Sequence, residues 1–132
     1  MDRPKGKLIA IGGNEDKGSY PNPKHKKKYY LDFFELGILK RFLNEIPASN
    51  PTIEVVTTAS LIPEEVGERY ESAFGILGCE NANMMHIREE EDALKPEYLE
   101  RIRKADGVMF SGGDQSRLTR IFGSTEFLQI VQ

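Results

Sequence analysis

Apolar residues along the chain alternate between short continuous runs and longer stretches in which they recur every three or four positions. The short runs are typical of buried strands, and they lie at residues 7–11, 53–57, 83–88 and 108–110. The periodic stretches are typical of amphipathic helices, and they begin near residues 30, 63, 96, 115 and 126. Strands that alternate with helices in this way predict βαβ units, a parallel sheet and helices on both faces of it.

Residues that begin or end helices support these boundaries. Pro47 ends the first helix, because a proline inside a helix removes a hydrogen bond and clashes with the preceding turn. Pro63 suits the first helical position, and Gly78 is a suitable stop for the same helix. Glu64 and Glu65 lie where the positive end of that helix favours acids.

The end of the sequence interrupts a pattern. Ser124 and Thr125 are suitable N-caps for a last helix, yet residues 126–132 contain no Gly, Pro or basic residue that would end it. A sheet closed after residues 108–110 would also leave that strand at an exposed edge. We therefore expect residues 1–132 to be the N-terminal part of a single α/β domain, truncated before its next strand.

Composition narrows the class of protein. With 132 residues, 39% of them hydrophobic and 30% charged, the chain is typical of one soluble globular domain. A formal net charge of −3 gives no reason to expect a nucleic-acid partner. The single cysteine excludes an intrachain disulfide, and the N-terminal apolar run is too short for a signal peptide or a membrane span. We expect a cytoplasmic protein without a membrane partner or a metal.

Two glycine pairs follow predicted strands. Gly12 and Gly13 stand in IGGNEDKGS, and the second pair stands in SGGDQ after residues 108–110. Ligands of open α/β sheets bind beyond the carboxyl ends of strands, so we expect both loops to approach one crevice. IGGNEDKGS does not fit a phosphate-binding loop, and Glu15 and Asp16 would repel a phosphate. A turn whose acids cap local amides is an alternative to a direct role in a site.

The SGGDQ stretch carries the more specific signal. The backbone N–H groups of Gly112 and Gly113 can approach a ligand closely and stabilise an oxyanion, by about 3 kcal/mol per donor. The side-chain amide of Gln115 can both donate to and accept from a substrate. The alternative is a plain helix start, with Asp114 as the cap and the glycines only making the bend.

Other residues with reactive side chains have simpler interpretations. Ser111 does not fit a G-x-S-x-G nucleophile elbow, so we interpret it as a strand-end hydroxyl. His86 falls on the third predicted strand and is interpreted as a structural histidine. His25 lies in a basic loop, and residues 89–92 form an acidic loop, both interpreted as solvated. No Ser–His–acid set is assembled in the sequence.

Taken in order, IGGNEDK, TTAS with PEEVGERY, HIR and GVMFSGGDQSRL resemble the cyanophycinase family, serine-type exopeptidases related to aspartyl dipeptidase. The resemblance runs along nearly the whole chain, and its most specific parts are residues 12–17 and 112–115. It departs from the family at Asn14, where a small residue is usual, and at Ser111, where Thr is frequent. It implies a flavodoxin-like scaffold.

The resemblance also implies roles for residues. Gly112 and Gly113 would form part of the oxyanion hole, and Gln115, beside Asp114, would contact a peptide substrate. A nucleophilic serine in G-T-S-A-G-A, with its His and acid, would follow later in the fold and is not in these 132 residues. The implied substrate is cyanophycin or another β-aspartyl peptide, with no cofactor, and activity would need the C-terminal part of the fold.

Two other classes of function stay open at this point. A non-catalytic binding or assembly module, including a homo-oligomer, would pair the exposed strand at residues 108–110 with another chain by strand addition. A nucleotide-binding domain would be stabilised by ATP or NAD, and the departures of IGGNEDKGS from phosphate loops argue against it.

Overall fold

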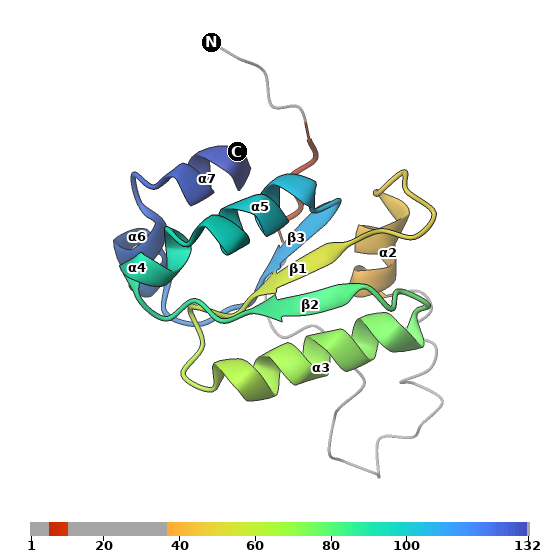
Figure 1. Cartoon of the computed structure of the whole chain (residues 1–132). Helices are drawn as coiled ribbons and strands as arrows, with labels where there is room; N and C mark the ends of the chain where they lie inside the picture. The colour runs from red at the N-terminus through yellow and green to blue at the C-terminus, as the bar shows by residue number, and fades with distance from the viewer. Residues whose placement is uncertain (1–5, 11–36, 132) are drawn as a thin grey trace, which may run out of the picture.

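The computed structural model describes residues 6–10 and 37–131, which contain three parallel strands with helices on both sides (Figure 1). The sheet order is β2-β1-β3, with every pair parallel. In chain order the elements are α2 (Ile38–Asn44), β1 (Ile53–Val56), α3 (Pro63–Ile76), β2 (Ala82–Met85), α4 (Glu90–Ala93), α5 (Pro96–Lys104), β3 (Gly107–Phe110), α6 (Gln115–Phe122) and α7 (Glu126–Val131). The predicted α/β class is confirmed, and the arrangement is that of part of a flavodoxin-like domain.

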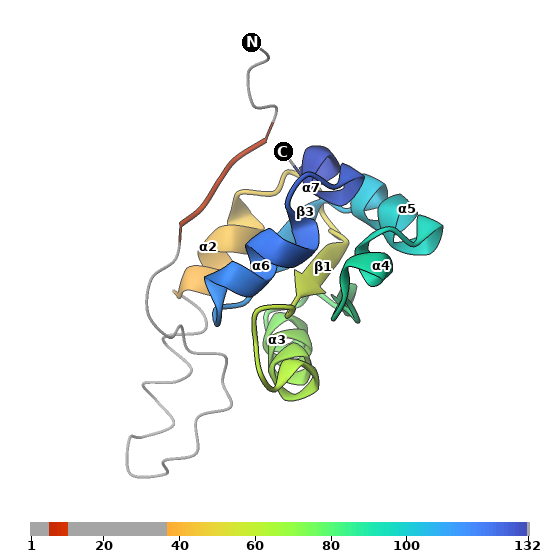
Figure 2. The same ribbon diagram turned by 90° about the vertical axis from the view of Figure 1, so that its left-hand side faces the viewer.

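Each face of the sheet has its own apolar core. Side chains alternate along a strand, so Ile53 and Val55 face one side while Val56 faces the other. The first side packs against α2 and α3, and the second against α4 to α7. Figure 2 shows α2 and α5 on opposite sides of the strands. Both faces of β1 are thus covered, which is why its four residues are all buried.

Two helix ends follow the sequence signals closely. Gly78 adopts a φ of 93°, which glycine tolerates, and its N–H donates to the carbonyl of Gly75 at 3.0 Å. At the last helix, the Thr125 hydroxyl oxygen accepts the N–H of Leu128 at 3.3 Å, so Thr125 is the N-cap of α7. Ser124 lies in the turn between α6 and α7 and has a φ of 62°.

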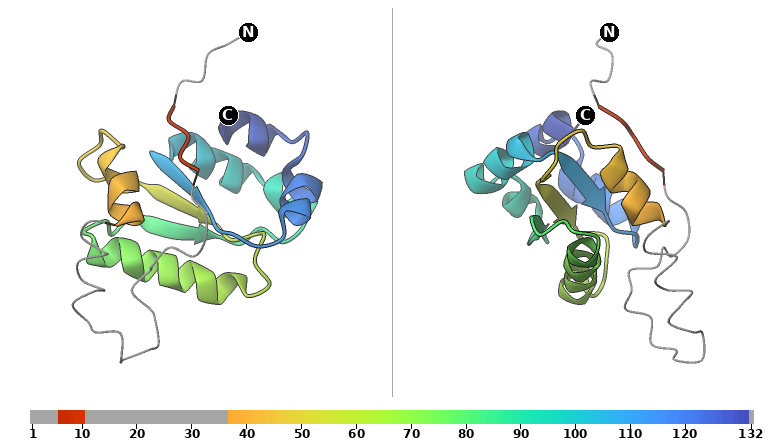
Figure 3. Two further views of the ribbon diagram at one scale, coloured as in Figure 1. Left: turned by 180° about the vertical axis from the view of Figure 1, so that it is seen from behind. Right: turned by 90° about the vertical axis from the view of Figure 1, so that its right-hand side faces the viewer.

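The predicted strand at residues 7–11 is wrong over residues 7–10. These residues belong to no strand, and Leu8 is 97% exposed. Lys7 instead reaches the carboxylate of Glu45 at the end of α2, with 2.8 Å between Nζ and Oε2. Both sides of β1 are taken by β2 and β3, and residues 7–10 do not add to the outer edge of β3 either, so their apolar side chains stay outside the sheet. Figure 3 shows residues 6–10 outside the packed elements.

Other boundaries shift by a few residues. The strand expected at 83–88 is β2, which ends at Met85, and the acidic stretch expected as a loop contains α4. The carboxylate of Asp92 accepts the N–H groups of Arg88 and Glu89, both at 3.0 Å, and so starts that helix. The helix expected from residue 30 is observed from Ile38; residues 30–36 lie outside the described part. No helix in that part is long and apolar enough to cross a membrane.

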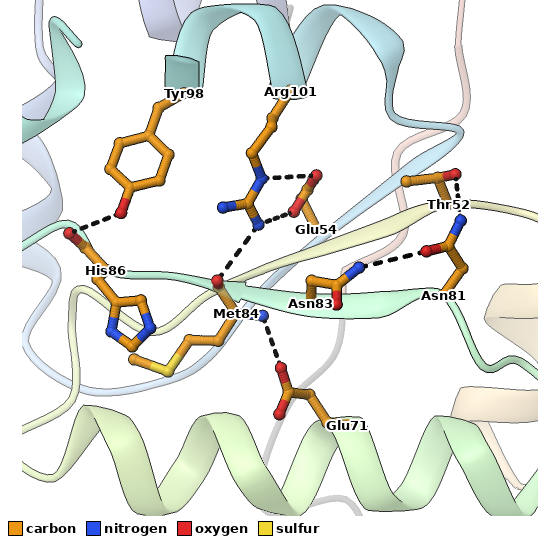
Figure 4. A network of polar contacts seen from close by, with 9 residues as sticks. All are labelled: Thr52, Glu54, Glu71, Asn81, Asn83, Met84, His86, Tyr98 and Arg101. Carbon is orange, nitrogen blue, oxygen red and sulfur yellow. Dashed lines mark hydrogen bonds and ion pairs between the residues drawn. The ribbon is translucent and has the colours of Figure 1, made fainter.

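Side chains close the outer edge of β2. The N–H of Met84 donates to Glu71 of α3 at 2.9 Å, and its carbonyl accepts from Arg101 of α5 at 3.3 Å (Figure 4). Arg101 also pairs with Glu54, whose side chain is only 4% exposed. The outward backbone groups of Met84, in the middle of this edge strand, are therefore satisfied, which opposes pairing with another chain there.

The outer edge of β3 has no such cover among the described residues. Gly107 and Ser111 donate their N–H groups towards the β1 side, to Thr52 and Val56. In a parallel strand the intervening residues then point their N–H and carbonyl groups the other way. These are Val108 and Phe110, and their outward groups find no partner in the described part of the chain.

Candidate functional site

The candidate site lies where β1 and β3 end side by side. We call residues 57–60 the β1 loop and residues 111–114 the glycine loop. The N–H of Ser111 donates to the carbonyl of Val56 at 3.0 Å, and the N–H of Asp114 donates to the carbonyl of Ala59, also at 3.0 Å. The second bond continues the contact between the strands into their loops, so the glycine loop rests on the β1 loop.

Gly113 is required by the backbone geometry of this contact. Its φ is 144°, a region that favours glycine. A Cβ at this position would also overlap the carbonyl oxygen of Ala59. Gly112 is different, because an added Cβ there would have no atom within 4 Å. The sequence pair Gly-Gly thus combines one residue fixed by packing with one that faces open space.

The two glycine amides are available as donors. Within the described residues, neither the N–H of Gly112 nor that of Gly113 donates a hydrogen bond, and both residues are exposed. The next amide, that of Asp114, is already bonded to Ala59. Two consecutive free N–H groups at the carboxyl edge of a parallel sheet can stabilise a negatively charged oxygen.

Asp114 caps α6. Its Oδ1 accepts the N–H of Ser116 at 2.9 Å and the hydroxyl of Ser116 at 2.6 Å. These bonds to Ser116, with the nearby positive charge of Arg117, hold the pKa of the Asp114 carboxyl below its usual value. The plain helix-start interpretation therefore holds for this side chain, while the amides before it are left for a ligand. A contact between Asp114 and a substrate stays a prediction.

The remaining predicted site residues fall into two groups. Gln115 is the first residue of α6, is exposed, and its side-chain amide has no hydrogen bond within the described part. Gly12, Gly13, Glu15 and Asp16 lie outside the described residues. The predicted meeting of the two glycine loops therefore stays a prediction.

Two buried hydroxyls stand beneath the loops. Thr57 directly follows β1 and Ser111 directly follows β3, with exposures of 0% and 4%. Continuing the register of Val56 with Phe110 places them opposite each other on the same face of the sheet. Neither hydroxyl oxygen has a hydrogen-bond partner. Ser111 is thus a strand-end hydroxyl, as predicted. Thr57, the first residue of the TTAS stretch, was not predicted to lie at the site.

Sequence reasoning also missed Arg88. Its guanidinium, half-buried beyond β2, donates to three carbonyls of the β1 loop: from Nη1 to Thr57 at 3.4 Å and to Thr58 at 3.1 Å, and from Nη2 to Ser60 at 3.0 Å. The only sequence signal is an arginine a few residues after an apolar run, in HIR.

The interpretation of His86 as a structural histidine on a strand is wrong. His86 follows the end of β2, its side chain is exposed, and its backbone carbonyl accepts from the Tyr98 hydroxyl at 3.5 Å (Figure 4). The described residues hold no group of three or more His, Cys, Asp or Glu side chains that could bind a metal ion.

Comparisons with known proteins point to one family. No protein-family model matches the chain. Over 125 residues, 95% of this chain, it is 29% identical to a cyanophycinase of Trichormus variabilis and 26% identical to one of Geminocystis herdmanii. A cyanophycinase of Synechococcus elongatus is 29% identical over 124 residues. The chain spans 37%, 40% and 34% of these relatives' lengths. The chain is therefore similar to one part of these cyanophycinases.

Proposed function

We propose that this chain supplies the oxyanion-binding and substrate-contacting part of a cyanophycinase-like serine peptidase. The observation that carries the proposal is the pair of unbonded amides at Gly112 and Gly113, held at the carboxyl edge of the sheet. The relation to cyanophycinases supports a peptide substrate of the β-aspartyl-arginine type. The nucleophilic serine and its His and acid would come from a segment outside these 132 residues.

The proposed reaction uses these amides at its charged step. A serine oxygen attacks the carbonyl carbon of the scissile amide, and the electron pair of the C=O bond moves onto its oxygen. The N–H groups of Gly112 and Gly113 donate to that oxyanion, where charge develops. The His takes the proton of the serine hydroxyl and gives it to the leaving nitrogen, so collapse expels a neutral amine and leaves an acyl-enzyme, which water then hydrolyses. The exposed amide of Gln115 binds and orients the substrate, which favours reaction by proximity.

The test compares the chain alone with the chain joined to the remaining part of a relative's domain. Release of β-aspartyl-arginine dipeptides is expected only from the joined protein. In it, Gln115→Ala should lower kcat/KM by about tenfold to a hundredfold, as expected for losing one or two polar contacts to substrate. The matched control, Gln129→Ala on an exposed position of α7, should leave kcat/KM unchanged. Activity of the isolated chain that survives Ser111→Ala and Gln115→Ala would refute the proposal.

A second candidate function is assembly through the outer edge of β3. The favouring observation is the contrast between the two sheet edges: Glu71 and Arg101 bond the outward groups of Met84 on β2, whereas those of Val108 and Phe110 on β3 have no partner in the described part. An extended segment of another chain would add there as a strand. Light scattering over a concentration series tests this, and a monomer at every concentration contradicts it.

A further inference from the structure

We infer that Arg88 is a positioning residue for the glycine loop, although its side chain donates its hydrogen bonds to the β1 loop and not to the glycine loop. The inference deepens the proposed function and rests on it for its catalytic meaning. It starts from the arrangement of three loops at the carboxyl edge of the sheet: Arg88 follows β2, the β1 loop lies in the middle, and the glycine loop follows β3.

The first step is the contact between Arg88 and the β1 loop. Three carbonyl oxygens of that loop converge on one guanidinium, at distances of 3.0 to 3.4 Å. Because the guanidinium is planar and carries its donors in a fixed fork, it can hold several acceptors in one geometry, which a lysine cannot. A further hydrogen bond joins the β1 loop to the segment that carries Arg88: the Thr58 hydroxyl donates to the carbonyl of Ile87 at 2.8 Å.

The second step is the contact between the β1 loop and the glycine loop. The carbonyl of Ala59 lies between the carbonyls of Thr58 and Ser60, both of which Arg88 holds. That Ala59 carbonyl accepts the N–H of Asp114, and its oxygen fills the space in which a Cβ of Gly113 would stand. The orientation of the Gly112 and Gly113 amides is therefore set by a carbonyl whose two neighbours are fixed by Arg88.

Charge is secondary in this role. No carboxylate of the described residues lies within ion-pair distance of the Arg88 guanidinium, which is bonded to neutral carbonyls only. The Arg88 guanidinium contributes positive charge here, but the carboxylate of Asp92, which accepts the backbone N–H of Arg88 at 3.0 Å, offsets part of it, so the hydrogen bonds to the β1 loop carry the role. Arg88 thus acts on the oxyanion site through the loop that it holds.

The test measures amide hydrogen exchange on the isolated chain by NMR. In Arg88→Ala, exchange of the Asp114 amide should rise by about tenfold to a hundredfold, because charge-assisted bonds that fix its acceptor are lost. Exchange of the Ser111 amide, which donates to β1, should change less. The matched control is Arg69→Ala, whose side chain pairs with Glu65 on the exposed face of α3 and should leave both amides unchanged.

Two further arms keep the result interpretable. Arg88→Lys keeps the positive charge but lacks the planar set of N–H donors. The exchange rate of the Asp114 amide should rise less in this variant than in Arg88→Ala. Guanidinium chloride, added to Arg88→Ala far below denaturing concentrations, should restore part of the protection of Asp114, which a general loss of stability would not allow. The inference fails if Asp114 exchanges as in the Arg69 control, or if Ser111 and Asp114 accelerate equally without rescue. Neither outcome depends on activity, so either is distinct from failure of the proposed function.

Discussion

Gly112 and Gly113 are adjacent and identical in the sequence, yet the structure places different demands on them. Gly113 combines a φ of 144° with a carbonyl oxygen in the place of its missing Cβ, whereas Gly112 has open space around that position. Sequence reasoning recognised the pair as a bend that frees amides. It could not tell the two apart, because the difference comes from Ala59, which is 54 positions earlier in the chain and meets Gly113 only in the folded sheet.

Gly113→Ala is predicted to destabilise the fold by about 1 to 3 kcal/mol, because the backbone strain and the overlap with Ala59 both appear at this position. Gly112→Ala, the matched control, should change the free energy of unfolding by less than about 0.5 kcal/mol, as expected of an exposed site. Urea unfolding of both variants checks the pair. Equal losses would show that the contact with Ala59 does not fix Gly113.

Asp114 gives a prediction for pH. Because the Ser116 bonds hold the pKa of its carboxyl below the unfolded value, the ionised cap stabilises the fold fully above the unfolded pKa, near 4. That stabilisation is lost as pH falls from there through the folded pKa. Asp114→Asn keeps an oxygen acceptor without the titration, so its deficit in Tm at pH 7 should shrink below pH 4. A deficit that stays constant from pH 7 to pH 3 would contradict this role.

At the scale of elements, local signals predicted what local contacts decide. Pro63, Gly78 and Thr125 each mark a helix end correctly, because caps and turns depend on a few neighbouring residues. The prediction that failed, the strand over residues 7–10, depends on pairing with residues far away in the sequence. KLIAI has the composition of a buried strand, but residues 7–10 join no strand of the sheet, and nothing within these residues encodes whether a partner strand is at hand.

The ion pair between Glu54 of β1 and Arg101 of α5 also joins residues far apart in the sequence. It leads to a prediction for stability. Arg101→Met should destabilise the fold by roughly 3 kcal/mol, because it leaves the carboxylate of Glu54 buried without its partner. This loss of unfolding free energy lies at the low end of the range for a broken buried ion pair. The reason is that the Arg101 side chain is 35% exposed, so solvent screens part of the interaction.

The control for this pair replaces both residues. Glu54→Leu with Arg101→Met removes both charges and should recover most of the lost free energy of unfolding, because replacing a buried ion pair by apolar residues is often neutral. Thermal unfolding of the two single variants and the double variant provides the cycle. A double variant as unstable as the sum of the singles would show that Glu54 and Arg101 act independently.

At the scale of the whole molecule, the sheet is asymmetric. On its β2 edge, side chains from helices on both faces bond the outward groups of Met84, from Glu71 of α3 and Arg101 of α5 (Figure 4). Its β3 edge carries the candidate site at its carboxyl end and stays unpaired within the described residues. Both proposals for function use this edge: the peptidase needs a nucleophile delivered beside the glycine loop, and the assembly module needs a strand partner.

A proline on β3 separates edge pairing from ordinary loss of packing. The N–H of Val108 points away from β1, so Val108→Pro removes an outward donor while β3 keeps its bonds to β1. Val108→Ala is the matched control, because it trims the side chain and keeps the N–H. If chains associate through this edge, light scattering should show that association at high concentration is lost in Val108→Pro and kept in Val108→Ala. Association unchanged in both variants would place the contact elsewhere, leaving the glycine loop's edge free for a segment of the same fold.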